Sequence, residues 1–329
     1  MKKAKTPAGQ KKLKLRELYK VFNESDNVLI MINADPDSMA SALAMKRLLW
    51  RRVASVAVSN INVVSRPDNM AMIRLLGIRM RHVEGIRTAD YNRFVILDSQ
   101  PNHNDCFMNT RFDVVIDHHP DTGYPAGYSD IRPEYGATAS IMTEYLRAAG
   151  IKPSTKLATA LFHAIKIDTN NFERKTITDD MRAFQFLFRR TNLHLARKIE
   201  QAEVRLSDLK YYAKALARKT MRKGKLFAHL GTVENPDICV HIADFFMRIE
   251  AVQWSIVSGV YDNTLIVIFR NDGIRKNADK VSSESFGDMG SAGGHKSAAR
   301  AEIPMAGVKN EVKPFNAANL SRWIKKRVN

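Results

Sequence analysis

Acidic residues and two adjacent histidines gather at places along this chain where apolar runs end. Three such runs, each with the composition of a buried strand, are followed directly by acidic side chains, and a further aspartate lies between helical segments. The set comprises Asp35, Asp37, Asp98, Asp117, His118, His119 and Asp168. Because ligands in open α/β sheets bind at the carboxyl ends of the strands, we expect these side chains to share one cleft.

Several carboxylates in one cleft repel one another unless cations neutralise them. Oxygen-rich ligation with one imidazole suits Mn²⁺ or Mg²⁺ better than it suits a structural zinc. One or two such ions, about 4 Å apart where there are two, can polarise a phosphoryl group and activate water. The pattern therefore predicts a metal-dependent phosphoesterase, a hydrolase acting on ester bonds.

Each part of this pattern also has a simpler interpretation. Asp35-Pro36-Asp37 is as typical of a turn or a helix N-cap as of a pair of ligands. Asp117-His118-His119 alone would suit a surface loop, and Asp168 alone would suit a cap on the following helix. The combination favours the shared site over these separate interpretations.

Asp117-His118-His119 resembles the signature of the DHH phosphoesterase superfamily. Further segments resemble that family's other motifs in the family's order: residues 31–41 the first, residues 95–98 the second and residues 167–172 the fourth. Residues 293–299, GGHKSAA, resemble the motif of the associated C-terminal domain, DHHA1. The two-domain layout is similar to the nanoRNase (oligoribonuclease) and pAp-phosphatase branch.

The resemblance implies roles for the acidic and imidazole side chains. In that branch, Asp37, Asp98, His118 and Asp168 would hold one Mn²⁺ or Mg²⁺, and Asp35 with Asp98 would hold a second. The resemblance also implies that His119 contacts or protonates the phosphate, with Asp117 as the second catalytic residue.

The chain departs from the family's first motif, where Met31 replaces a histidine. A thioether is a poor ligand for Mn²⁺ or Mg²⁺, so the second metal site loses a ligand that only a neighbour such as Asn33 could replace. Asn170 and Arg300 also stand where the family has glycine. Two hypotheses stay open: a hydrolase with one full and one weak metal site, and a catalytically weakened relative that binds nucleotide or nucleic acid.

The glycine-rich motif near the C-terminus predicts a second half of the site. Consecutive glycines let backbone N–H groups approach an anion, and we expect a helix N-terminus in residues 296–301 to add positive charge. The expected substrate-binding residues are Arg270, Gly293, Gly294, His295 and Ser297. The motif argues against pyrophosphate hydrolysis, which remains a further alternative together with cyclic dinucleotide hydrolysis.

The order of elements predicts an α/β fold. We expect a mostly parallel-sheet DHH domain with helices on both faces, joined by a helical connector to a smaller α/β DHHA1 domain, with the substrate in the cleft between the two domains. The expected parts are a basic arm 1–14, the catalytic domain 15–192, the connector 193–218, the substrate-binding domain 219–305 and a basic tail 306–329. Residues 238–242 are predicted to be one of the strands of the second domain.

A net charge of +18 over 329 residues favours phosphate-rich partners. We therefore expect short single-stranded RNA or DNA, or a nucleotide, as substrate, and exonuclease-type cleavage. Cys106 and Cys239 are far apart without CxxC spacing, which argues against a zinc site or disulfides. Without a long apolar run or a secretory signal, a cytoplasmic location away from membranes is expected, and a homodimer is left open.

Overall fold

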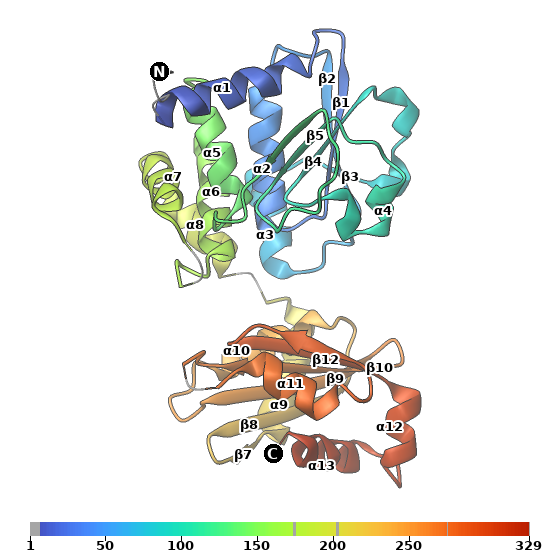
Figure 1. Cartoon of the computed structure of the whole chain (residues 1–329). Coiled ribbons are helices and arrows are strands. Elements are labelled where there is room, and N and C mark those ends of the chain that lie inside the picture. Colours follow the sequence, from blue (N-terminus) through green and yellow to red (C-terminus); the bar gives the residue numbers. More distant parts are fainter. Residues whose placement is uncertain (1–6, 174–175, 202–203, 275, 329) are drawn as a thin grey trace, which may run out of the picture. The chain divides into compact units, whose positions relative to one another are not determined.

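The computed structural model describes residues 7–173, 176–201, 204–274 and 276–328, in two compact units, Met1–Glu203 and Val204–Asn329 (Figure 1). The first unit contains a six-stranded sheet in the order β3-β2-β1-β4-β5-β6, with every neighbouring pair parallel. Its strands are β1 (Asn27–Ile32), β2 (Ser55–Asn60), β3 (Arg81–His82), β4 (Arg93–Leu97), β5 (Val114–Asp117) and β6 (Tyr128–Ile131). The predicted α/β class and parallel sheet are confirmed.

The two faces of this sheet are covered unequally. On β1, Ile30 and Ile32 pack into a large apolar cluster with the main helices, whereas Leu29 and Met31 point to the opposite face. The cluster on that opposite face is smaller and receives Phe107 from α4 (Asp105–Met108). The main helices are α1 (Pro7–Lys20), α2 (Pro36–Leu48), α3 (Pro67–Leu76), α5 (Thr138–Ala148), α6 (Thr155–Asp168), α7 (Thr178–Phe188) and α8 (Leu193–Glu200).

The segment expected as a basic arm is in large part a packed helix. Residues 1–6 lie outside the described residues, and from Pro7 onward the chain forms α1. Leu15 and Leu18 of α1 are buried in the main cluster of the first unit. The segment was expected to be an arm because it is basic, but its described residues Lys11 and Lys14 pair with acidic side chains of the first unit.

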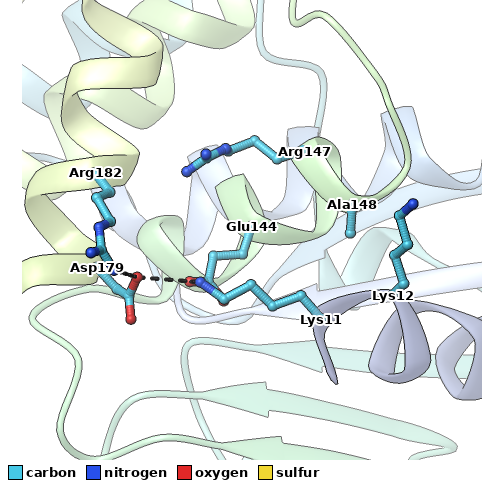
Figure 2. A pocket seen from close by; sticks show the side chains of 7 residues that line it. All are labelled: Lys11, Lys12, Glu144, Arg147, Ala148, Asp179 and Arg182. Atoms are coloured by element: carbon cyan, nitrogen blue, oxygen red, sulfur yellow. Dashed lines mark hydrogen bonds and ion pairs between the residues drawn. The ribbon is translucent and has the colours of Figure 1, made fainter. Parts of the chain in front are cut away.

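Buried carboxylates of α5 and β6 hold this helix in place. Arg132 donates to both oxygens of Asp130, at 2.9 and 2.6 Å, and to Glu144 at 2.7 Å. Lys14 of α1 adds a contact of 2.5 Å to Asp130, and Lys11 pairs with Glu144. Figure 2 shows Lys11 reaching from α1 across to Glu144 and Asp179 on other helices, where these side chains line a pocket of about 370 Å³.

The second unit is built on a mixed sheet of six strands in the order β11-β12-β10-β9-β8-β7, in which only β8 and β9 are parallel among the described pairs. One face packs against α9 (Leu209–Arg218) and α10 (Asp237–Phe246), and the other against α11 (Ala278–Phe286), α12 (Met305–Glu311) and α13 (Ala317–Arg327). The strands are β7 (Thr220–Arg222), β8 (Lys225–Thr232), β9 (Trp254–Tyr261), β10 (Thr264–Asn271), β11 (Ser291–Gly294) and β12 (Ala298–Pro304).

Two predicted elements of the second unit are wrong. Residues 238–242 belong to α10, because Ile238, Ile242 and Phe246 recur at the helical spacing of four and are all buried on the sheet. Residues 296–301 do not begin a helix, since β12 starts at Ala298 and pairs antiparallel with both β10 and β11. A short, mostly apolar segment is compatible with a strand or a helix, and the structure around a glycine-rich turn cannot be assigned from the turn alone.

The expected connector 193–218 contains two separate helices. In the first unit α8 packs against α3 and α6, and in the second unit α9 packs against β8. Among the described helices, none is long and apolar enough to cross a membrane.

The buried ion network predicts a large effect of removing its cation. Arg132→Met should lower the free energy of unfolding by about 3–5 kcal/mol, because the carboxylates of Asp130 and Glu144 would remain buried with fewer partners. Urea denaturation followed by circular dichroism measures this change. As a control, Arg87→Met removes an exposed pair with Asp90 and should change stability by less than about 0.5 kcal/mol. Equal effects of the two substitutions would contradict a structural role for the buried network.

Candidate metal centre

Four of the predicted ligands come together at the carboxyl edge of the parallel sheet. Asp98 follows β4, His118 follows the neighbouring strand β5, Asp37 lies in the first turn of α2, and Asp168 ends α6. The ligand atoms of Asp37, His118 and Asp168 lie within 4.8 Å of one another, and so do those of Asp98, His118 and His119. His118 belongs to both groups, so it is the centre of the cluster.

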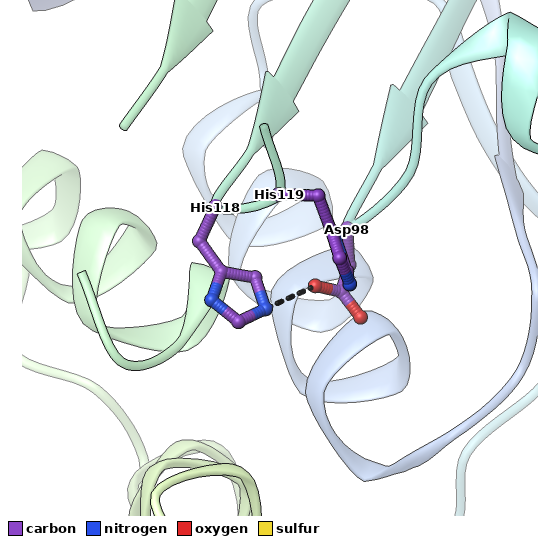
Figure 3. Close-up of side chains that lie close together, drawn as sticks. All are labelled: Asp98, His118 and His119. Carbon is purple, nitrogen blue, oxygen red and sulfur yellow. Dashed lines mark ion pairs between the residues drawn. The ribbon is translucent and has the colours of Figure 1, made fainter. Parts of the chain in front are cut away.

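The imidazole of His118 is fixed by a hydrogen bond on its far side. Its Nδ1 lies 3.3 Å from the backbone carbonyl of Tyr135, which can only accept, so Nδ1 carries the proton. The other nitrogen, Nε2, lies 3.1 Å from Asp168 Oδ2. It also lies 3.5 Å from Asp98 Oδ1, the contact drawn in Figure 3. A backbone partner on one ring nitrogen orients the other toward a metal in many metalloproteins.

Asp37 also anchors the start of α5. Its two carboxylate oxygens accept the backbone N–H groups of Thr138 and Ala139, each at 2.7 Å. These N–H groups belong to the first turn of α5, where they have no partner within the helix. The carboxylate therefore joins α2 to α5 and is held in one orientation, with the partial positive charge of a helix N-terminus beside it.

Asp98 has an unusual backbone conformation, with φ of +59°. Aspartate tolerates this left-handed region better than most residues, and such positions cluster at functional sites. Its N–H donates to the carbonyl of Ile116 at 2.9 Å, and its Oδ1 accepts the hydroxyl of Thr138 at 2.9 Å. The turn after β4 thereby directs the carboxylate at His118.

Asp35 lies apart from the closest groups of ligand atoms. It is the N-cap of α2, where its Oδ1 accepts the N–H of Ser38 at 2.8 Å and the Ser38 hydroxyl accepts the N–H of Asp35. Among the described residues, it belongs to neither group of close ligand atoms. Its charge is nevertheless near enough to raise the pKa values of Asp37 and Asp98. The interpretation of Asp35 as a helix N-cap is correct. Its Oδ1 forms the capping hydrogen bond, whereas its Oδ2 does not take part in the cap.

Burial and mutual repulsion shift the acids away from their ordinary titration. Burial, reinforced by the charge of Asp168, raises the pKa of Asp37 to about 7. Burial and then the charge of Asp37 raise the pKa of Asp98 well above its usual value. Burial alone would lower the pKa of His118, but Asp168 and Asp37 outweigh it and raise the pKa to about 9. The acids of the cluster thus lack sufficient positive charge around them, and they favour the protonated form of His118.

This donor set suits a divalent cation. Three carboxylates and one imidazole, with Nε2 oriented toward the acids, match the oxygen-rich ligation of Mn²⁺ or Mg²⁺. The residues that would hold such an ion are Asp37, Asp98, His118 and Asp168. A divalent ion would supply the charge that the imidazolium proton supplies here.

Asp117 is completely buried and supports its neighbours. Its Oδ1 accepts the backbone N–H of His118 and lies 2.8 Å from His119 Nδ1, and its Oδ2 accepts the Gln100 amide at 2.7 Å. Although burial opposes ionisation, the hydrogen bonds from His119 and Gln100 hold the pKa of Asp117 below its ordinary value. A carboxylate enclosed in this way orients His119 and cannot itself touch a substrate.

Met31, which stands where the family's first motif has histidine, fills the core. It is 1% exposed and packs with Leu29, Ile96 and Phe107 in the smaller apolar cluster of the first unit. Asn33 is exposed, and its backbone carbonyl accepts the Ser38 hydroxyl at 2.9 Å. The Met31 side chain therefore contributes to the apolar core. That Asn33 replaces the missing metal ligand stays a prediction.

The substrate-binding residues expected in the second unit gather at one end of its sheet, around the turn between β11 and β12. Arg270 lies opposite Ala298 in the register of β10 and β12, and its guanidinium pairs with Asp244 at 2.7 Å. The N–H of Gly294 donates to Asp279 at 3.0 Å and is thus not free for an anion. His295 and Ser297 complete the turn, with His295 exposed. The expected helix dipole is absent there, because the turn leads into a strand.

Sequence reasoning missed several residues that build the centre. Thr138 binds two of the acids, Tyr135 fixes His118, and Gln100 fixes Asp117. His103 also lies close, and its ligand atoms, with those of Asp117 and His119, fall within 4.8 Å of one another. Gln100 and His103 lie in the loop after β4, so a search of the whole loop for polar side chains could have found them.

Residues 27–165 match the model of the DHH family, N-terminal domain. An uncharacterized protein of Methanocaldococcus jannaschii is 34% identical over 279 residues, which are 84% of this chain and 58% of that relative. The chain thus spans a little over half the length of the relative.

Two solved structures share the fold over nearly the whole chain. An exopolyphosphatase-related protein from Bacteroides fragilis covers 96% of this chain and 95% of its own, with a TM-score of 0.70 and 14% identity. RecJ from Thermus thermophilus, in complex with Mn²⁺, covers 98% of this chain and 56% of its own, with a TM-score of 0.52 and 12% identity. At such identities the likeness concerns the fold.

A parallel sheet with acids and imidazoles close together at its carboxyl edge defines an α/β protein with a candidate metal centre. The family match makes this more specific. Over residues 27–165, the first unit is similar to the DHH family.

The two adjacent glycines of the second unit should respond differently to substitution. A Cβ at Gly294, where φ is +153°, would lie 2.4 Å from the carbonyl oxygen of Ala298 and 2.6 Å from the Cα of Ala299, both backbone atoms. Gly294→Ala should therefore destabilise the protein by more than about 2 kcal/mol. At Gly293 the nearest atom is a side-chain oxygen 3.5 Å away, so Gly293→Ala is the matched control with little expected loss. Thermal denaturation compares them, and similar melting temperatures would refute the close-approach argument.

Proposed function

We propose that the protein is a metal-dependent phosphoesterase that hydrolyses short oligonucleotides or nucleoside 3′,5′-bisphosphates such as pAp. The observation that carries the proposal is the convergence of Asp37, Asp98 and Asp168 on the Nε2 side of His118, whose Nδ1 is held by Tyr135. The match of residues 27–165 to the DHH family model supports it, because this range contains Asp37, Asp98 and His118.

We assign Asp37, Asp98, His118 and Asp168 to one well-held ion, Mn²⁺ or Mg²⁺. Asp35 and Asp98 would contribute to a weaker second site, because Asp35 is already engaged as a helix cap and Met31 is buried in the core. A bound ion would polarise the phosphoryl group and lower the pKa of water. The RecJ structure that shares this fold was solved with Mn²⁺, which favours testing that ion first.

The chain's own residues would do the rest of the chemistry. His119 is half-exposed, and its hydrogen bond to Asp117 is the largest cause of its raised pKa. With Nδ1 held by Asp117, the other ring nitrogen is available to contact or protonate a phosphate oxygen. We therefore give His119 the contact with substrate and give Asp117 the role of positioning it.

A short anionic oligonucleotide or nucleotide suits the net charge of +18. Arg270, Gly293, Gly294, His295 and Ser297 remain the proposed substrate-binding residues of the second unit. Since Gly294 already donates to Asp279 and Arg270 to Asp244, substrate would have to compete with these acids. We propose that Arg270 binds phosphate in exchange for its exposed partner, Asp244.

The second candidate function is binding of nucleotide or nucleic acid without cleavage. The specific observation in its favour is that Met31 replaces the first-motif histidine and packs as a core residue. A panel of substrates separates the two functions: dinucleotides, longer oligomers, pAp and, because of the exopolyphosphatase-related neighbour, polyphosphate.

Hydrolysis should depend on Asp98. In Mn²⁺ the wild-type protein should release mononucleotide or phosphate from the panel, and Asp98→Asn should lose at least about 100-fold in rate, because Asn keeps the left-handed backbone but not the charge. Asp105→Asn changes an exposed aspartate of α4 outside the cluster and is the matched control. If wild type and Asp98→Asn gave equal amounts of product, the hydrolase proposal would be wrong and binding without cleavage would be favoured.

Metal binding should release a proton. At pH 7.5 the raised pKa of His118, about 9, keeps its imidazole protonated, and that proton must leave before Nε2 can bind an ion. Because Asp37 and Asp98 also have raised pKa values, Mn²⁺ affinity should rise with pH by at least about tenfold per unit between about pH 7 and 9. Calorimetry in two buffers of different ionisation enthalpy measures the released proton. An enthalpy that is independent of the buffer would exclude His118 as a ligand.

A further inference from the structure

A pocket on the C-terminal unit is lined by cations without acidic residues. It has a volume of about 540 Å³, and its walls come from α9, β8 and α13. Its polar lining residues are Arg218, His229, Ser321, Arg322 and Lys325. We call it the α9–α13 pocket. It shares no residue with the acidic cluster or with the glycine-rich turn of the same unit.

The cations of the α9–α13 pocket have no carboxylate partners among the described residues. Within the described part of the chain, Arg322 donates a hydrogen bond to the Asn319 amide oxygen, at 3.1 Å, and Arg218 and Lys325 make no ion pair. In the pocket of Figure 2, by contrast, Lys11 and Arg182 are both paired with acids. Like charges held together without counter-ions attract an anion, and a phosphate group is an anion that Arg and Lys side chains bind well.

His229 adds a buried polar group to the same pocket. Its side chain is 5% exposed, and its Nδ1 lies 2.9 Å from the Ser258 hydroxyl. Within the described residues, Nε2 has no hydrogen-bond partner. Burial, with the charges of Lys214 and Arg218, lowers the pKa of His229 to about 4, so the ring is neutral at pH 7. Because His229 lines the pocket, its Nε2 is available for a hydrogen bond with a ligand that enters it.

A second, more apolar pocket adjoins the first and shares His229 and Ala317 with it. Its volume is about 260 Å³, and Met305 and Leu320 form part of its lining. Phe315 also lines it and is 46% exposed, which is unusual for a phenylalanine unless a partner covers it. The Lys309 ammonium lies 5.9 Å from the Phe315 ring. An aromatic surface beside a cationic pocket matches a base beside a phosphate.

We propose that the two adjoining pockets form a nucleotide-binding site, with the phosphate held by Arg218, Arg322 and Lys325 and the base stacked against Phe315. The ligand is a nucleotide unit, either free or as part of a single strand. This site differs from the proposed substrate site, because the lining of the two pockets includes neither Arg270, its partner Asp244, nor the glycine-rich turn. It therefore goes beyond the proposed function and does not depend on metal.

The test is calorimetric binding of adenosine 5′-monophosphate, inorganic phosphate, adenosine and a short oligoadenylate to the full chain in EDTA. The monophosphate should bind about tenfold more tightly than phosphate or adenosine, because it uses both pockets. Arg322→Ala and Lys325→Ala should each weaken its binding about tenfold. Phe315→Ala should weaken the monophosphate but leave inorganic phosphate unchanged.

Lys326→Ala is the matched control, because it removes the same charge from the next residue of α13, which is exposed and does not line the pocket. Equal weakening by Lys325→Ala and Lys326→Ala would overturn the site in favour of diffuse attraction. Equal affinities for phosphate and the monophosphate would overturn the nucleotide assignment. Loss of binding in Arg270→Ala but not in Arg322→Ala would place the nucleotide elsewhere.

Tighter binding of the oligoadenylate than of the monophosphate would identify a strand as the ligand, and equal binding a free nucleotide. Thermal denaturation of each variant, with Arg322→Lys as the conservative replacement that should retain most of the affinity, separates loss of the site from loss of the fold. Since divalent metal is absent throughout, failure of the proposed hydrolysis would leave this result unaffected, and the reverse also holds.

Discussion

Carboxylates buried at the edge of a parallel sheet must find positive charge, and this constraint organises the first unit. Asp37 finds it at the N-terminus of α5, where it accepts two backbone N–H groups, and in His118. Asp98 receives the Thr138 hydroxyl, and Asp168 receives the imidazole. These contacts provide hydrogen bonds to the acids but do not neutralise their negative charge. The pKa values of Asp37 and Asp98 are raised as a result. A divalent ion would neutralise this charge.

Two aspartates of the cluster stabilise helix N-termini and are also proposed metal ligands. Asp35 caps α2 and Asp37 caps α5, so the simple interpretation of each aspartate as a helix cap and its interpretation as a ligand are compatible. Capping fixes the rotamer of a carboxylate and leaves lone pairs free, which is what a preorganised ligand requires. Met31 shows the opposite case, since a core-packing duty there excludes a ligand.

The strands of the first unit were predictable from the sequence, and so was the position of the acids that follow them. Short apolar runs that end in acidic residues are typical of buried strands with functional residues at their carboxyl ends. β1 and β4 are two such runs, and Asp98 directly follows the second. The second unit was harder: residues 238–242 carry an apolar run whose helical period emerges only with Phe246, and residues 291–304 form a hairpin around glycines that had suggested a helix start. The contacts of Tyr135 and Thr138 with the acids depend on tertiary structure, which local sequence does not contain.

The left-handed backbone at Asp98 bears on how this protein can evolve. A single nucleotide change converts an aspartate codon into one for asparagine or glycine, and both residues are comfortable at a φ of +59°. Either replacement would also relieve a buried and repelled charge. Folding alone therefore gives selection no reason to keep an acid at this position, so the fate of residue 98 in descendant lineages would record whether its chemistry is still in use.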